Sequence, residues 1–127
     1  MGLDNGIMIR GKRHLELNLP YPAWDWGSRD LEICYWRKFW GFRNEMVQHF
    51  HQKEECAYIP LLVDDLQEVI EILENYLDRD YYEMNADSVW LYEECLVKII
   101  HDIENIQELI RYMNENHDVI CYFYDSY

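Results

Sequence analysis

The sequence predicts a single α+β domain in which three helices pack on a small mixed sheet, formed by an N-terminal hairpin and the C-terminal strand. Three observations lead to this prediction. Apolar and polar residues alternate over residues 6–19, apolar residues recur with helical spacing in three later segments, and the tail VICYFYDSY is apolar on both pleat faces. The length of 127 residues corresponds to one domain, so residues 1–127 are assigned to it.

The first predicted element is a β-hairpin over residues 6–19. Its sequence, GIMIRGKRHLELNL, alternates on either side of Gly11 and Lys12, a dipeptide suited to a two-residue turn. The following segment, PYPAWDWGSRD, contains two prolines and a glycine and is expected to be a loop. The triplet LEI at residues 31–33 is either a short strand or the entry to a helix.

The first predicted helix spans Tyr35–Gln52. Its apolar side chains recur at a spacing of three and four residues, which places them on one stripe. This stripe consists of Trp36, Phe39, Trp40, Met46, Val47 and Phe50. Arg37, Lys38 and Arg43 fall largely on the opposite side, and Gly41 weakens the helix and marks a close packing contact.

A short extended segment and a second helix are predicted next. Pro60 in AYIPLLV indicates an edge strand or a bend, because proline cannot donate to a sheet ladder. The helix is expected to begin at Asp64, whose carboxylate can cap the first turn, with Gln67 at the capping-box position. Its apolar stripe is Leu66, Val69, Ile70, Leu73 and Leu77.

The last two elements are a long helix and a strand. After a polar and aromatic link, DRDYYEMNAD, the helix is predicted over Ser88–Asn114 and is about 40 Å long at about 1.5 Å per residue. The tail at residues 119–127 is apolar on both faces, which is typical of a strand in the middle of a covered sheet.

Negative charge is concentrated in the second half of the chain. Residues 1–52 hold seven Lys or Arg and six Asp or Glu, whereas residues 53–127 hold four and nineteen, and the whole chain has a formal net charge of -14. Such a surface repels nucleic acid and membranes and attracts basic proteins. The chain shows no secretory leader and no apolar run long enough to span a membrane, so we expect a cytoplasmic location.

The stretch CYWRKFWGFRNEM, residues 34–46, combines aromatic and basic residues. This combination fits either a core helix with a basic outer side or a stacking platform for single-stranded nucleic acid. Phosphate binding grows with the number of cations engaged, and three cations act here against the field of an acidic chain. The sequence therefore favours the core helix, and we expect no direct binding of nucleic acid.

No motif of catalysis, cofactor binding or metal binding is present. His49 and His51 stand two residues apart and cannot share one face of a helix, so no metal site is expected there. Phosphate-binding glycine loops and nucleophile motifs are absent, so we assign no catalytic residue and no cofactor, and the sequence disfavours an enzyme. The cysteines are predicted to be reduced, mostly buried thiols: Cys34, Cys56, Cys95 and Cys121.

Several short segments together resemble a family of small proteins of phages, prophages and Firmicutes. Members of this family begin with Met-Gly-Leu-Asp and carry a Tyr-Trp-Arg-Lys motif, matched here by residues 1–4 and 35–38. The segment YIPLLVDDL and the ending VICYFYDSY add to the likeness, which covers most of the chain. The resemblance implies an origin in a mobile genetic element, whose small accessory proteins often act on host machinery. It carries no catalytic residue over to this sequence.

The leading functional prediction is a non-enzymatic, acidic interaction protein. It would present its acidic half to a basic host protein, for example by binding in the nucleic-acid channel of a defence nuclease. It would inhibit or modulate that protein by charge mimicry, as anti-CRISPR proteins and other DNA mimics do. The predicted contact residues are Glu68, Glu71, Glu74, Asp78, Asp80, Glu93, Glu94, Asp102, Glu104 and Glu108.

Two other functions remain open from the sequence. The first is a small-ligand binding protein or enzyme, for a ligand of the nucleotide type, with a pocket of tryptophan and arginine side chains at one rim of the sheet. Its expected residues are Asp4, Trp36, Arg37, Trp40 and Asp125. The second is a protein whose negative charge only keeps it soluble.

Overall fold

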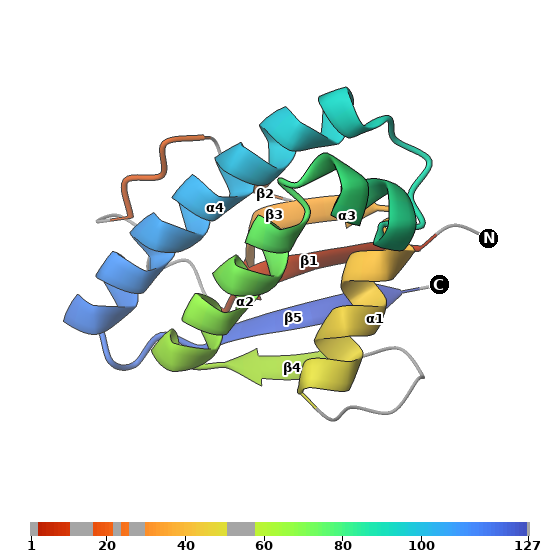
Figure 1. The fold of residues 1–127 in the computed structure, drawn as a ribbon. Helices are drawn as coiled ribbons and strands as arrows, with labels where there is room; N and C mark the ends of the chain where they lie inside the picture. The colour runs from red at the N-terminus through yellow and green to blue at the C-terminus, as the bar shows by residue number, and fades with distance from the viewer. Residues whose placement is uncertain (1–2, 11–16, 22–23, 26–29, 51–57, 127) are drawn as a thin grey trace.

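Five strands form one antiparallel sheet in the order β2-β3-β1-β5-β4, and four helices accompany it (Figure 1). The structure is a computed structural model, and it describes residues 3–10, 17–21, 24–25, 30–50 and 58–126. The elements are β1 (Asp4–Ile9), β2 (Trp24–Asp25), β3 (Leu31–Arg37), α1 (Trp40–His49), β4 (Tyr58–Leu61), α2 (Val63–Asn75), α3 (Arg79–Asn85), α4 (Tyr92–Glu115) and β5 (Cys121–Ser126). The predicted α+β class is confirmed.

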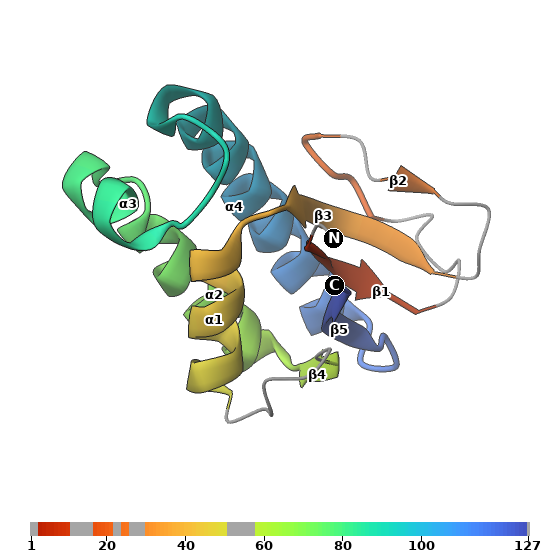
Figure 2. The ribbon, with the colours of Figure 1, turned by 90° about the vertical axis from the view of Figure 1, so that its right-hand side faces the viewer.

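The helices lie on one side of the sheet, and the core fills the space between them (Figure 2). Ile7 and Ile9 of β1 and Phe123 of β5 point to this side, where α2 and α4 contribute Leu66 and Leu109, all of them fully or almost fully buried. The first residue of β1 and the last residue of β5 lie side by side at one end of the sheet, where Asp4 pairs with Ser126 (Figure 1). Among the described helices, none combines the length and the apolar character that crossing a bilayer requires.

Strand β1 occupies the centre of the sheet, and this corrects the predicted hairpin. One edge of β1 pairs with β3 and the other with β5, so both edges are taken. Residues 17–19 are therefore not a strand beside β1, and the expected turn at Gly11 and Lys12 lies outside the described residues. Every ladder between the described strands is antiparallel. The prediction of a mixed sheet is therefore wrong.

The predicted first helix begins five residues late, because its first residues belong to β3. Tyr35 and Trp36 pair with Gly6 and Asn5 of β1, where aromatic residues fit the half-buried pleated surface. Lys38 follows with a positive φ of 56°, which ends the strand. A register irregularity between Ile7 and Met8 inserts an extra residue into β3.

Two contacts fix α1 to the rest of the domain. The Gly41 N–H donates to the Ala86 carbonyl at 2.7 Å, and a Cβ at Gly41 would stand 1.9 Å from the Asn85 carbonyl oxygen. The predicted packing role of Gly41 is thus confirmed. Arg43 was placed on the outer side of the helix and is instead buried, with its Nε 2.5 Å from Asp125 Oδ2 in β5.

The later elements follow the predictions with shifted boundaries. Strand β4 is an edge strand that contains Pro60, as expected, and β5 lies between β1 and β4. Helix α2 begins at Val63, because Asp65 rather than Asp64 accepts a hydrogen bond from the Leu62 N–H, at 2.8 Å. The segment expected to be only a link contains α3, so the described part of the chain has four helices where three were predicted.

Tyrosine hydroxyls donate to carboxylates at several places in the fold. On β3 and β5, Tyr35 donates to Asp4 at 2.5 Å and Tyr124 donates to Glu32. A side chain at Gly6 would collide with the groups around it, since a Cβ there would stand 3.0 Å from both Glu32 and Tyr124. Burial, and then the hydrogen bond to Asp4, raises the pKa of Tyr35 to about 12.

The helices repeat this arrangement at Glu45. Both Tyr76 of the α2 C-cap and Tyr81 of α3 donate to its carboxylate. Burial is the first cause and the bond to Glu45 the second cause of the raised pKa of Tyr81, which reaches about 12. Neutral hydroxyls therefore hold α1, α2 and α3 together where a lysine or arginine would otherwise be expected.

We predict that Gly41→Ala destabilises the protein by about 2 kcal/mol, the usual range for forced overpacking. Alanine is normally the better helix former, so a free surface position would gain stability instead. Urea unfolding followed by circular dichroism measures the change. The control is Gln48→Ala at an exposed position of the same helix. Equal or greater stability of Gly41→Ala would contradict the backbone contact.

We also predict that stability falls as the pH rises above about 10. The unfolded chain releases its tyrosine protons near pH 10, whereas folded Tyr35 and Tyr81 keep theirs to about 12. The stabilisation is therefore complete below about pH 10 and is lost as the pH rises toward 12. Urea midpoints at increasing pH and the tyrosinate absorbance of the native protein test this. Native tyrosines that all titrate like those in urea would refute it.

Candidate functional site

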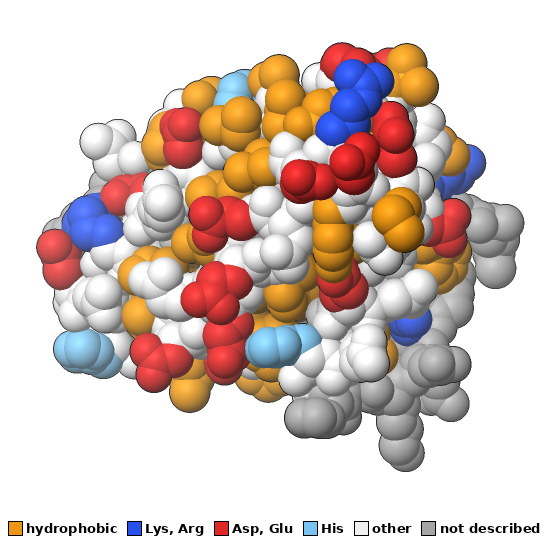
Figure 3. All heavy atoms as spheres, in the orientation of Figure 1, with side chains coloured by type: hydrophobic (Ala, Val, Ile, Leu, Met, Phe, Trp, Pro, Cys, Tyr) orange, Lys and Arg blue, Asp and Glu red, His pale blue; other side chains and the backbone are white. Residues whose placement is uncertain are grey.

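A row of carboxylates follows α2 and continues to α3, and we call it the acidic ridge. Figure 3 shows carboxylate side chains gathered over these helices on the face opposite to the sheet. The acidic ridge consists of Asp64, Asp65, Glu68, Glu71, Glu74, Asp78 and Asp80. All seven are exposed or half-exposed. Five of them belong to the predicted contact set.

Few cations accompany the acidic ridge. The sequence contains no Lys or Arg between residues 54 and 78. His49 lies 3.2 Å from Glu68, and Arg79, which stands between Asp78 and Asp80 in the sequence, bonds to Glu83 at 3.1 Å and Glu93 at 3.0 Å. Glu71 and Glu74 point into solvent.

The other predicted contact residues lie on α4 and differ from one another in exposure and partners. Glu93 is bound to Arg79, and Glu94 is exposed on the next position. Glu104 is half-buried, and Glu108 accepts from the Asn18 N–H and pairs with Arg111. Asp102 is 5% exposed and turned toward the sheet, because its position belongs to the inner side of α4, so its prediction as a surface contact is wrong.

The five residues of the alternative pocket meet at one rim of the sheet but point to different sides. Asp4 stands opposite Arg37, and the Asn5 position joins Trp36 to Asp125 across three strands. Trp36 is fully buried in the core, since strand alternation turns it toward the helices. Asp125 is bound to Arg43, and Trp40 is half-buried at the start of α1. A cavity of the described residues lies elsewhere and is lined by none of the five.

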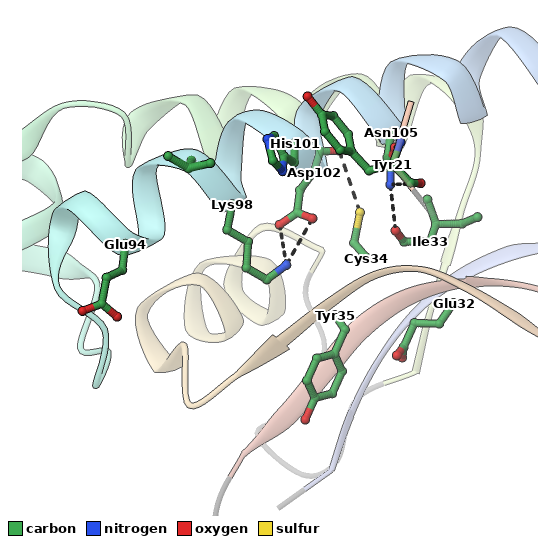
Figure 4. A pocket seen from close by; sticks show the side chains of 11 residues that line it. Tyr21, Glu32, Ile33, Cys34, Tyr35, Glu94, Lys98, His101, Asp102 and Asn105 are labelled. Atoms are coloured by element: carbon green, nitrogen blue, oxygen red, sulfur yellow. Dashed lines mark hydrogen bonds and ion pairs between the residues drawn. The ribbon is translucent and has the colours of Figure 1, made fainter. Parts of the chain in front are cut away.

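That cavity, of about 450 Å³, opens between α4 and β3 (Figure 4). Its described lining comprises Tyr21, Glu32, Ile33, Cys34, Tyr35, Glu94, Val97, Lys98, His101, Asp102 and Asn105. Figure 4 shows Lys98, Asp102 and Asn105 along the side of α4 that faces β3, whereas Tyr35 and Glu32 point away from the helix. The cavity is therefore built mainly by one helix, the edge of one strand and the loop before it.

An ion pair forms the centre of the cavity. Lys98 Nζ lies 2.9 Å and 3.2 Å from the two oxygens of Asp102, and 5.5 Å from the ring centroid of Trp36. Burial raises the pKa of Asp102, while the charge of Lys98 opposes that shift. The Lys98 side chain is 33% exposed and that of Asp102 only 7%, so water reaches the cation more easily than the anion.

Asn105 positions the aromatic wall of the cavity. Its Oδ1 accepts from the Tyr21 N–H at 3.1 Å, and its Nδ2 donates to the carbonyls of Tyr21 at 3.2 Å and Ile33 at 3.3 Å. The loop is thereby tied to both α4 and β3. The Tyr21 ring stacks on His101 with the centroids 3.7 Å apart and an interplanar angle of 15°.

The cysteines of the described residues are structural. Cys34, Cys95 and Cys121 are free and buried, as predicted, while Cys56 lies outside the described residues. Burial raises the pKa of all three thiols, which keeps them protonated and unreactive. The Cys34 thiol donates to the Asp102 carbonyl at 3.8 Å.

Two residues of this cavity, Glu94 and Asp102, were predicted as surface contacts for a partner, and its other lining residues were assigned to no functional site. The sequence contains one indication of this polar lining. Lys98, Asp102 and Asn105 follow one another at four and three residues beside the apolar stripe of the long helix, so they share one face of it. Charged residues at that spacing are usual on a solvated face, so the pattern alone did not separate them from the surface carboxylates.

The comparisons with known proteins add no relative. No protein-family model, curated protein or solved structure matches this chain. Within the described part of the chain, no group of three or more His, Cys, Asp or Glu residues is placed to hold a metal ion. The functional argument therefore rests on the geometry of the ridge and the cavity.

We predict that Lys98→Met costs about 2–4 kcal/mol at neutral pH, because it leaves Asp102 buried without its cation. The folded-state pKa of Asp102 is raised above its usual 3.8, and removal of Lys98 raises it further. The cost is therefore expected to shrink as the pH falls below that raised pKa and Asp102 takes up a proton. Urea unfolding at neutral and mildly acidic pH measures both effects.

The control for this prediction is Lys98→Met combined with Asp102→Asn. With no ionisable group left at the pair, the double variant should lose the pH dependence that Lys98→Met alone shows. A cost of Lys98→Met that is the same at both pH values would argue against a charged Asp102 in the folded protein.

Proposed function

We propose that the protein is a non-enzymatic interaction protein that binds a basic partner protein through the acidic ridge. The observation that supports this is the row of seven carboxylates from the start of α2 to the first turn of α3, six of which precede Arg79 in a stretch of sequence without Lys or Arg. Complementary charge raises association rates and excludes wrong partners, so a one-sign surface is suited to choosing a basic protein.

The arrangement of the ridge supports more than solubility. Asp64, Glu68, Glu71 and Glu74 follow one another at four, three and three residues, which makes them neighbours on the helix surface. Like charges at this spacing destabilise a helix by about 0.2–0.5 kcal/mol per pair. The same number of carboxylates spread over the whole surface would give similar solubility without that cost.

The finer form of this proposal is charge mimicry of nucleic acid. The Cβ atoms of residues three or four apart on a helix lie about 5–6 Å from each other, whereas each strand of duplex DNA carries one phosphate per about 3.4 Å of rise. The acidic ridge is thus a row of negative charges like the phosphates of one DNA strand, but with a wider spacing. The resemblance to phage and prophage proteins favours a host nucleic-acid-binding protein, such as a defence nuclease, as the partner.

The test is capture of partners from a bacterial host lysate on immobilised wild-type protein and on the variant Glu71→Lys/Glu74→Lys. We expect wild-type protein to retain a nucleic-acid-binding protein that elutes as salt rises, because exposed charge pairs are screened. The ridge variant should lose it. Mass spectrometry identifies the retained protein, and competition with duplex DNA tests the mimicry.

The matched control is Glu94→Lys/Glu104→Lys, which makes the same change in net charge on α4. It should keep the partner if the ridge is the binding surface. Equal retention by wild type and both variants would show that the ridge is not used, and equal loss from both would show that only net charge matters.

A further inference from the structure

The cavity between α4 and β3 carries an excess of negative charge. The ammonium of Lys98 is held by both oxygens of Asp102, at 2.9 Å and 3.2 Å, and the pair is neutral as a unit. Glu94 lies one helical turn before Lys98, is exposed and has no ion-pair partner among the described residues. A ligand that enters the cavity therefore meets an unpaired carboxylate at this end.

The opposite end of the cavity is aromatic and held in place. Tyr21 and His101 stack face to face, and Asn105 holds the Tyr21 backbone by its N–H and its carbonyl. The ends are separated by the seven residues from Glu94 to His101, which is about 10 Å along the axis of α4. Val97, on the same stretch of helix, adds apolar surface between them.

We propose that this cavity binds a small organic cation that carries a flat ring, with its ammonium beside Glu94 and its ring against the Tyr21 and His101 stack. Its volume of about 450 Å³ lies within the range of ligand pockets, about 300–1,000 Å³. A nucleotide, the ligand type of the alternative function, would bring the negative charge of its phosphates close to the carboxylate of Glu94, and like charges repel. The proposal is independent of the acidic ridge.

The probe is tryptamine, which joins an indole ring to a protonated amine. We expect saturable shifts of amide resonances in nuclear magnetic resonance spectra, concentrated on residues 94–105 of α4 and on Ile33 and Cys34 of β3. A fragment of this size is expected to bind with a dissociation constant on the order of 1 mM. Two comparison ligands test the contributions of the ring and of the amine of tryptamine. Indole-3-acetate has the same ring with a negative charge, and n-butylamine has a protonated amine without a ring.

The matched variants are Glu94→Gln and Glu93→Gln. Glu93 is adjacent and equally charged, but its carboxylate is bound to Arg79 at 3.0 Å and is not part of the cavity lining. Glu94→Gln should weaken tryptamine binding about three- to five-fold, the range of an exposed charge pair, and Glu93→Gln should leave it unchanged. Both substitutions are at exposed positions, so the folded spectrum serves as the check of structure.

The outcomes decide the proposal as follows. Saturable tryptamine shifts in the cavity, with no comparable binding of indole-3-acetate or n-butylamine and a loss only in Glu94→Gln, support it. Shifts that fall on the acidic ridge instead, or equal binding of n-butylamine, would show that the surface attracts cations without a ring-binding site. Equal binding of indole-3-acetate, equal effects of the two variants or no saturable shifts would also overturn it.

Discussion

Each carboxylate that folding removes from water needs a hydrogen-bond donor, and the chain has eleven Lys and Arg to set against twenty-five Asp and Glu. The structure meets this shortage in two ways. Tyrosine hydroxyls serve Asp4, Glu32 and Glu45, and a buried arginine is placed where two elements must be joined. This residue is Arg43, which connects α1 to Asp125 of β5. The surplus of carboxylates is left to the outer helices, where water solvates it.

The same division of charge separates the two faces of α4 from each other. One side of α4 packs on α2 and completes the apolar core beneath the acidic ridge. The side toward β3 carries Lys98 and Asp102, which pair with each other, and Asn105, which bonds to Ile33 of β3 and to the backbone of Tyr21. The helix therefore connects the candidate partner surface to the candidate ligand cavity through a rigid body of buried side chains.

Local patterns predicted the elements better than their partners. The α+β class follows from the alternating and helical spacing of apolar residues, and the edge strand at Pro60 and the contact at Gly41 follow from the backbone limits of single residues, so the sequence was sufficient for them. The hairpin was wrong because alternation reveals a strand but not its neighbours, and β1 pairs with segments up to about 120 residues away. Tyr35 and Trp36 suit a strand and a helical stripe equally in sequence, and only pairing with β1 decides between them. The cavity depends on such long-range contacts, which explains why Lys98 and His101 were not predicted.

The polar lining of the cavity is the strongest reason to regard it as more than a packing defect. A buried ion pair such as Lys98 and Asp102 is often no more stabilising than apolar side chains of similar size, and an interrupted apolar stripe lowers the packing of the helix on the sheet. Leucines at these positions would close the gap and extend the core. The chain instead keeps a charged pair, orders the loop at Tyr21 through Asn105 and leaves Glu94 unpaired at the opening. Preorganised polar groups around an open volume are the usual composition of a ligand site, and stability alone does not account for them here.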